Sequence, residues 1–302
     1  MINSIGPLKK GDTVLVITPA KAIEKNDVEN AVSLFESWGL NVEVGSFALG
    51  KNYYFSGTDK ERISDLQWAL DHPRAKAIVC ARGGYGTIRI VNEVDYALFL
   101  KHPKWVVGFS DITVLHNKLH GSLMLPTIHA VAPLYFNQLE SSSETIVTLR
   151  KAMFGEKYSI EIPTKKHDRL GIGTGLLVGG NLAIVESLIG TNLDIDTTGK
   201  ILFLEDVSEY AYKIDRMLWS LKYAGKFDKI SALIIGGLTD VKNAEETFGV
   251  GIEELVINVL SEYDFPVVFN FPAGHQLDNR AMIFGTFYKL HITEEYSNLE
   301  QI

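Results

Sequence analysis

Residues 106–116 read V-V-G-F-S-D-I-T-V-L-H, and the stretch changes character at its centre. The apolar run that ends at Gly108 is typical of a buried parallel strand, whereas apolar residues take helical spacing directly after Ser110. The stretch therefore predicts a strand that turns abruptly into a helix. Such turns are the joints from which α/β domains are built.

The same alternation of strand and helix runs through the first half of the chain. Helical segments separate three short β-rich runs, D-T-V-L-V-I-T-P-A, N-V-E-V-G and A-K-A-I-V-C-A. Thr58 and Glu61 have the spacing of a capping box and predict a helix that stops near Pro73. This order predicts a parallel sheet with helices on both faces, in which ligands bind at the carboxyl ends of the strands.

The pattern weakens after about residue 138, and polar stretches such as 163–169 separate it from a second set of strands and helices. We therefore expect an N-terminal α/β domain over 1–150, a linker over 151–170 and a C-terminal domain over 171–302. A chain of 302 residues suits two domains of ordinary size.

Composition narrows the class of protein. Hydrophobic residues make up 46% and charged residues 22% of the chain, and the formal net charge is −8. An acidic chain argues against nucleic acid as a partner. The single cysteine, Cys80, excludes an internal disulfide. The N-terminus lacks the apolar region of a signal peptide, and no run nears the ~20 apolar residues that span a bilayer. We expect a cytoplasmic protein without a membrane partner.

Ser110 is the first candidate for chemistry. A serine at a sharp strand-to-helix turn is exposed at the top of the sheet, next to backbone N–H groups that can bind an oxyanion. The full G-x-S-x-G pattern is not met, because Ile112 stands where the second glycine would be. On spacing alone, a helix cap formed by Ser110 or Asp111 explains the pattern better than a nucleophile does.

A serine nucleophile needs a base and a group that orients the base. His275 is the best candidate for the base, because it lies in a glycine-containing loop directly after a strand, whereas His129 ends a strand and can line the site. His116 and His120 lack the glutamate of a zinc-binding H-E-x-x-H pattern and read as solvent-facing or packing residues. The orienting acid is either Glu205 or Asp206, since both end an apolar strand; spacing leaves this choice open.

The glycine-rich stretch at residues 82–86, R-G-G-Y-G, also follows a predicted strand. It lacks the third glycine of a dinucleotide-binding loop, and no phosphate-binding G-K-[ST] occurs in the chain. No zinc-ligand cluster is visible either. We therefore expect no cofactor and no metal. The glycines suit a backbone that approaches a ligand closely, or a simple tight turn.

These pieces together resemble one family, the LD-carboxypeptidases, serine peptidases that trim muropeptides and are related to microcin-immunity carboxypeptidases. The matching stretches occur in the family's order; they are A-R-G-G-Y-G at 81–86, G-F-S-D-I-T at 108–113, G-G-N-L at 179–182, L-E-D-V-S-E-Y-A-Y-K-I-D-R-M-L at 204–218 and G-H at 274–275. Family members more often carry Tyr where this chain has Phe109, a change that conserves shape.

The resemblance implies roles for particular residues. Ser110 would be the nucleophile, Glu205 the acid that orients histidine, and His275 the general base. The backbone N–H groups of Gly84 and Asp111 would form the oxyanion hole. It also implies a flavodoxin-like N-terminal domain, a smaller β-rich C-terminal domain, a site in the cleft between them, and a possible homodimer.

The implied reaction is hydrolysis of an L,D-peptide bond, which releases the terminal D-Ala from murein tetrapeptides in cell-wall recycling. The partner would be a small muropeptide. Its terminal carboxylate needs a local cation or a cluster of N–H groups, and Arg82 is either a contact of that carboxylate or a structural tie. The alternative is a microcin-immunity-type hydrolase that cleaves aminoacyl-nucleotide amide or acyl-sulfamoyl bonds, which would need an aromatic surface such as Tyr210, Tyr212 or Trp219.

Overall fold

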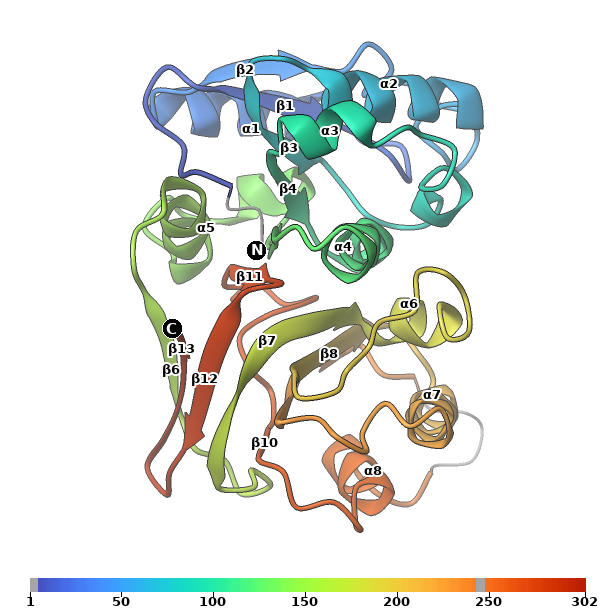
Figure 1. Cartoon of the computed structure of the whole chain (residues 1–302), viewed down its shortest axis with the longest axis vertical. Coiled ribbons are helices and arrows are strands. Elements are labelled where there is room, and N and C mark those ends of the chain that lie inside the picture. The colour runs from blue at the N-terminus through green and yellow to red at the C-terminus, as the bar shows by residue number, and fades with distance from the viewer. Residues whose placement is uncertain (1–4, 243–247) are drawn as a thin grey trace. The chain divides into compact units, whose positions relative to one another are not determined.

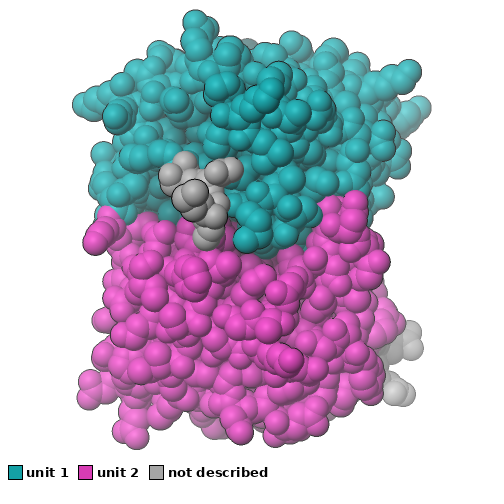
Figure 2. Space-filling view, viewed as in Figure 1, with its two compact units in different colours: residues 1–156, 280–283 teal, residues 157–279, 284–302 magenta. Residues whose placement is uncertain are grey.

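The structure is a computed structural model, and it describes residues 5–242 and 248–302. The chain forms two compact units, which Figure 2 colours separately. The first comprises residues 1–156 with 280–283, and the second comprises residues 157–279 with 284–302. Each unit is built around one sheet, whose strands Figure 1 labels.

The first sheet has six strands in the order β11-β5-β4-β3-β1-β2. Their bounds are β1 Thr13–Ile17, β2 Asn41–Val44, β3 Ala75–Cys80, β4 Trp105–Gly108, β5 Thr127–His129 and β11 Met282–Phe284. Each pairing from β2 through β1, β3 and β4 to β5 is parallel. The order 2-1-3-4-5 is that of flavodoxin-like folds, so the predicted fold class of this domain is confirmed.

The helices between these strands follow from local signals. They are α1 Lys25–Ser37, α2 Asp59–Asp71, α3 Ala97–Lys101, α4 Thr113–His116 and α5 Glu144–Phe154. The predicted capping box starts α2: Thr58 accepts the N–H of Glu61, and the Glu61 carboxylate accepts the N–H of Thr58. The helix ends shortly before Pro73, because the residue before a proline disfavours helical backbone.

The predicted helix after Ser110 is also present, but it changes pitch along its length. A 3₁₀ turn over Ser110–Ile112 leads into α4, and a π-helical segment over Asn117–Ser122 follows. All four residues of α4 are buried.

The second sheet has seven strands in the order β10-β9-β8-β7-β12-β13-β6. Their bounds are β6 Ser159–Pro163, β7 Gly171–Asn181, β8 Ile201–Val207, β9 Ala232–Thr239, β10 Val267–Val268, β12 Phe287–Ile292 and β13 Tyr296–Gln301. The pairings from β7 to β10 are parallel, and those from β7 to β6 are antiparallel. Helices α6 Leu182–Ser187, α7 Ala211–Tyr223 and α8 Ile252–Val259 gather beside the parallel half (Figure 1).

Two segments differ from the expected domain boundaries. The stretch expected as a linker, 151–170, contains the end of α5 and the edge strand β6, because Ile160 and Ile162 alternate inward and are buried. Residues 280–283, expected in the C-terminal domain, belong to the first unit, where β11 extends the sheet beside β5. Gly285, with a φ of 77°, lies between β11 and β12.

Candidate active site

Ser110 stands at a strained position of the backbone. Its φ is 64°, in the left-handed region that residues with a side chain rarely adopt. Gly108 ends β4 just before the turn, and a Cβ atom there would lie 3.0 Å from Cγ1 of Ile112 and 3.2 Å from Cβ of Cys80. A side chain at position 108 would therefore require Ile112 or Cys80 to shift by a few tenths of an ångström. Strain of this kind costs about 1–3 kcal/mol and clusters at functional sites.

The backbone does not support the interpretation of Ser110 as an ordinary cap. Cap residues have extended backbone, and here the extended residue before the 3₁₀ turn is Phe109, with a φ of −154°. The carboxylate of Asp111 is buried and accepts the N–H of Thr87 at 2.8 Å. Burial raises the pKa of Asp111, and its hydrogen bonds with Thr87 offset part of that rise. Asp111 thus ties the serine turn to the glycine-rich loop.

The glycine-rich loop lies directly against the serine. A Cβ atom on Gly83 would be 2.8 Å from Cβ of Ser110, 3.0 Å from its Oγ and 3.2 Å from the backbone N of Asp111. Gly84 and Gly86 have φ values of 112° and 137°, which favour glycine. The loop therefore brings bare backbone to the side of the serine.

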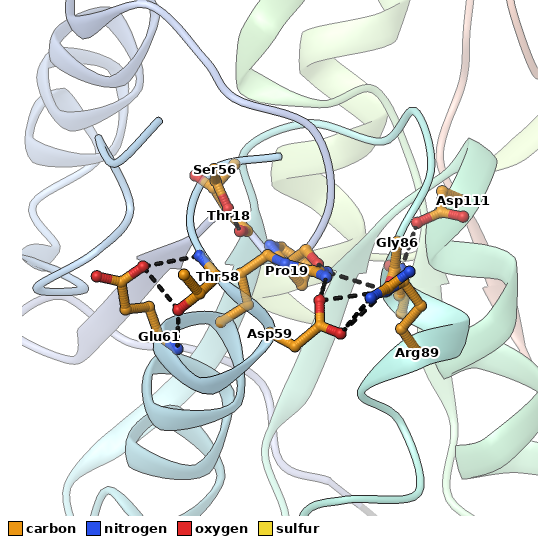
Figure 3. A network of polar contacts seen from close by, with 11 residues as sticks. Thr18, Pro19, Ser56, Thr58, Asp59, Glu61, Gly86, Arg89 and Asp111 are labelled. Atoms are coloured by element: carbon orange, nitrogen blue, oxygen red, sulfur yellow. Dashed lines mark hydrogen bonds and ion pairs between the residues drawn. The ribbon is translucent and has the colours of Figure 1, made fainter. Parts of the chain in front are cut away.

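A network of charged side chains holds this loop (Figure 3). The buried guanidinium of Arg62 donates to the carbonyl oxygens of Pro19 at 2.6 Å and Gly86 at 2.9 Å. It also forms an ion pair with Asp59 at 2.5 Å. Asp59 pairs with Arg89 as well, and the hydrogen bond from Arg89 is the main reason that the pKa of Asp59 is lowered. The buried guanidinium of Arg62 therefore fixes the glycine-rich loop through its hydrogen bond to Gly86.

Arg82 begins the same loop. Its Nη1 donates to the carbonyl oxygen of Ala22 at 2.9 Å. This bond links the segment after β3 to the segment after β1, so Arg82 has a structural contact.

Glu205 and His275 meet in the second unit. Nδ1 of His275 donates to Oε2 of Glu205 at 2.6 Å, and the backbone N–H of His275 donates to the same oxygen at 3.1 Å. The side chain of Glu205 is completely buried in β8. Because Nδ1 carries the proton toward the carboxylate, Nε2 is the ring nitrogen that can accept a proton.

The pair is packed without spare room. A Cβ atom on Gly274 would lie 2.6 Å from Cβ of Glu205, and the φ of Gly274 is 100°. Burial lowers the pKa of His275, but the charge of Glu205, its hydrogen bond and the charge of Asp206 outweigh burial, so the pKa is raised. The pair has the geometry of a general base held by an orienting acid.

Asp206, the other acid that spacing allowed, points to different partners. Its carboxylate accepts hydrogen bonds from Nδ2 of Asn181 and from the N–H groups of Ala183 and Val207. Burial and the neighbouring charge of Glu205 raise the pKa of Asp206 to about 6. Adjacent strand residues face opposite sides of a sheet, so only Glu205 reaches His275.

Two histidines that sequence reasoning valued less lie buried behind the serine turn. Nε2 of His116 donates to the carbonyl oxygen of Gly108 at 2.9 Å, and His129 pairs with Gly108 across β4 and β5. Burial lowers the pKa of His116 to about 4, so its ring is neutral at pH 7. The expectation that His116 faces solvent or simply packs misses its bond to Gly108. No sequence signal reveals that bond, because it depends on which face of the helix packs inward.

The structure thus brings together two groups of candidate residues. Ser110, Gly83 and Asp111 adjoin one another in the first unit, and Glu205 contacts His275 in the second. Within residues 5–242 and 248–302, no group of three or more His, Cys, Asp and Glu side chains could hold a metal ion. No helix in this described part is both long and apolar enough to span a membrane.

Comparison with known proteins shows which protein family the chain matches. It matches the family described as LD-carboxypeptidase N-terminal domain over residues 14–130 and its counterpart, the LD-carboxypeptidase C-terminal domain, over residues 174–290. A probable murein peptide carboxypeptidase of Bacillus subtilis is 32% identical, covering 97% of this chain and 93% of that protein. The chain belongs to the LD-carboxypeptidase family. Membership supports a serine-type hydrolase.

Further similar proteins match the chain over most of their length. The murein tetrapeptide carboxypeptidase of Pseudomonas aeruginosa is 28% identical over 90% of this chain and 91% of its own. The crystal structure of muramoyltetrapeptide carboxypeptidase from Oxalobacter formigenes superposes with a TM-score of 0.86 at 27% identity, over 96% of this chain and 98% of that one. The structure of MccF in complex with glutamyl sulfamoyl guanosine has a TM-score of 0.85 at 21% identity, over 98% of each chain, and shares the fold.

Proposed function

We propose that this chain is a serine carboxypeptidase that releases the terminal D-Ala from murein tetrapeptides by hydrolysing an L,D-peptide bond. Ser110 is the nucleophile, His275 the general base and Glu205 the acid that orients it. The observation that carries this assignment is the 2.6 Å hydrogen bond between Nδ1 of His275 and buried Glu205. The left-handed backbone of Ser110, at the end of this chain's G-F-S stretch, supports it.

The proposed reaction needs Oγ of Ser110 and Nε2 of His275 within hydrogen-bond reach when substrate is bound. Nε2 takes the hydroxyl proton as Oγ attacks the carbonyl carbon. The tetrahedral oxyanion then collapses, and the nitrogen of D-Ala leaves with the proton from His275. Nε2 of His275 then deprotonates a water molecule, which attacks the carbonyl carbon of the acyl-enzyme. The bond from that carbon to Oγ of Ser110 breaks, and Oγ takes the proton back from Nε2.

The backbone N–H groups of Gly84 and Asp111 are the proposed oxyanion donors. Both belong to segments that adjoin Ser110, one through its neighbour Gly83 and one as the next residue. A donor of this kind contributes about 3–4 kcal/mol to transition-state stabilisation. Backbone donors need no side chain at these positions, which agrees with a glycine-rich loop.

The substrate is inferred from the relatives, two of which are named for murein peptides or tetrapeptides. The test is mass spectrometry of a murein tetrapeptide incubated with wild type and with Ser110→Ala. Conversion to the tripeptide plus D-Ala by wild type only would support the proposal. Conversion by both proteins, or by neither, would contradict it.

A second candidate function is cleavage of aminoacyl-nucleotide amide or acyl-sulfamoyl bonds. Tyr210 and Tyr212 follow β8 and stack with ring centroids 5.5 Å apart, and Tyr212 is 42% exposed, so a flat aromatic surface is present. Trp219 is not part of it, because that ring packs against the core of the second unit. Turnover of an aminoacyl-sulfamoyl adenosine, with none of the tetrapeptide, would favour this function over the first.

A further inference from the structure

The segment after β1 runs beside the glycine-rich loop in the first unit. The backbone N–H of Lys21 donates to the carbonyl oxygen of Gly83 at 3.4 Å. The backbone of Lys21 also forms an isolated antiparallel β-bridge with that of Phe55. Along the chain, β2 is added on one side of β1, whereas β3 and the strands after it are added on the other side. The strand order therefore reverses between β1 and β3. In such sheets the crevice at the reversal point, outside the carboxyl ends of the strands, is the place where ligands bind.

The side chain of Lys21 lies against the exposed part of that loop. A Cβ atom on Gly84 would be 2.7 Å from Cβ of Lys21 and 3.3 Å from the hydroxyl oxygen of Tyr54. Nζ of Lys21 lies 4.9 Å from the centre of the Tyr54 ring, a cation–π distance. The ammonium group is therefore held on the loop that also adjoins Ser110 through Gly83.

The neighbouring cations differ in their partners. Arg62 and Arg89 both form ion pairs with Asp59. Arg82 pairs with no carboxylate in the part of the chain that the structure describes, but its Nη1 donates to the carbonyl oxygen of Ala22 and its Nε is buried. Within residues 5–242 and 248–302, Lys21 has no carboxylate within ion-pair distance. Lys21 thus has donors to offer an anion at this loop, in a chain whose net charge of −8 would otherwise repel one.

We propose that Lys21 binds the terminal carboxylate of the peptide substrate, with the hydroxyl of Tyr54 beside it. This assignment rests on the proposed function, since a carboxypeptidase must distinguish a chain end from an internal peptide bond. It gives Arg82 the role of a structural tie. A charge-assisted hydrogen bond from the ammonium group to the carboxylate would then select substrates whose chain ends one residue after the scissile bond.

The test compares the murein tetrapeptide with the same peptide amidated at its C-terminus, in wild type, Lys21→Met and Lys21→Arg. Lys25→Met is the matched control, because Lys25 lies on α1 and pairs with Glu29 at an exposed site. For the free acid, we expect Lys21→Met to raise KM about ten- to a hundredfold, the range of a hydrogen bond to a charged group. Lys21→Arg and Lys25→Met should stay close to wild type.

For the amidated peptide, Lys21→Met should change turnover little, so the preference for the free acid should collapse. An unchanged KM for the free acid in Lys21→Met, or an equal loss on both peptides, would overturn the assignment of Lys21 alone. Thermal unfolding of each variant separates a folding defect from lost binding. Absence of D-Ala release by wild type would instead overturn the proposed function, and this assignment with it.

Discussion

Gly83 lies so close to Ser110 that a Cβ atom on the glycine would stand 2.8 Å from Cβ of the serine. Real Cβ atoms do not approach one another so closely, so one of the two segments would have to move. The space beside Ser110 therefore accommodates the backbone of Gly83 but no side chain at that position. This contact links the glycine-rich loop directly to the proposed nucleophile.

Gly83→Ala should therefore damage catalysis more than folding. The added methyl group would displace Oγ or the loop, and misplacement by about 1 Å can lower activity about a hundredfold. Steady-state kinetics on the tetrapeptide, together with the melting temperature, measure the two effects. Gly6→Ala is the control, because a Cβ atom there meets nothing within 4 Å. Equal activities of the two variants would refute the close contact.

Glu205→Gln should lower kcat strongly while the protein remains folded. The amide keeps the shape of the carboxylate but removes the charge that stabilises the protonated imidazole, and such changes in triads cost about ten-thousandfold. Glu209→Gln, which alters an acid near the end of β8 that pairs with Lys213, serves as the control. A loss below about tenfold in Glu205→Gln would mean that the acid does not orient the base.

The pH dependence follows from the same pair. The base must be neutral to accept the proton, and the pKa of His275 is raised, so kcat/KM should fall as the pH drops through a value above the ordinary 6.5. Glu205→Gln removes the main cause of the rise and should move this acidic limb to lower pH. A pH profile of kcat/KM measures the limb, which should not move in Glu209→Gln.

His116 should act on the serine turn through Gly108. His116→Leu removes one of two donors to the Gly108 carbonyl oxygen, which keeps the N–H of Ala130, and the loss of one such hydrogen bond costs about 0.5–1.5 kcal/mol of stability. We expect kcat to fall about tenfold with little change in KM, since a shifted turn affects the attack more than binding. His116→Gln, whose amide can donate, should recover part of kcat. Loss of stability without any change in kcat would leave His116 with a structural role alone.

The fold of the first unit could be predicted because its signals are local. Buried parallel strands read as continuous apolar runs, and the capping box at Thr58 fixes the start of α2. Strand β11 could not be placed in the same way, because residues 282–284 join a sheet whose other strands end at His129. Pairing over such a separation leaves no mark on local sequence.

The candidate site was predictable in part for the same reason. A serine at a strand-to-helix turn is visible in the sequence, whereas its φ of 64° is not. The choice between Glu205 and Asp206 depends on which face of β8 the loop of His275 covers, and spacing contains no information on that. The edge strand β6 could have been read from the alternation of Ile160 and Ile162 in its polar surroundings.

The central claim is that His275, in the second unit, activates Ser110 in the first. A serine-reactive phosphonate followed by peptide mapping tests it most directly, because the reagent reports how nucleophilic each serine is. We predict that the adduct forms on Ser110 in wild type, is suppressed by the tetrapeptide, and is nearly abolished by His275→Ala. An adduct on another serine, or undiminished labelling of Ser110 in His275→Ala, would contradict the account.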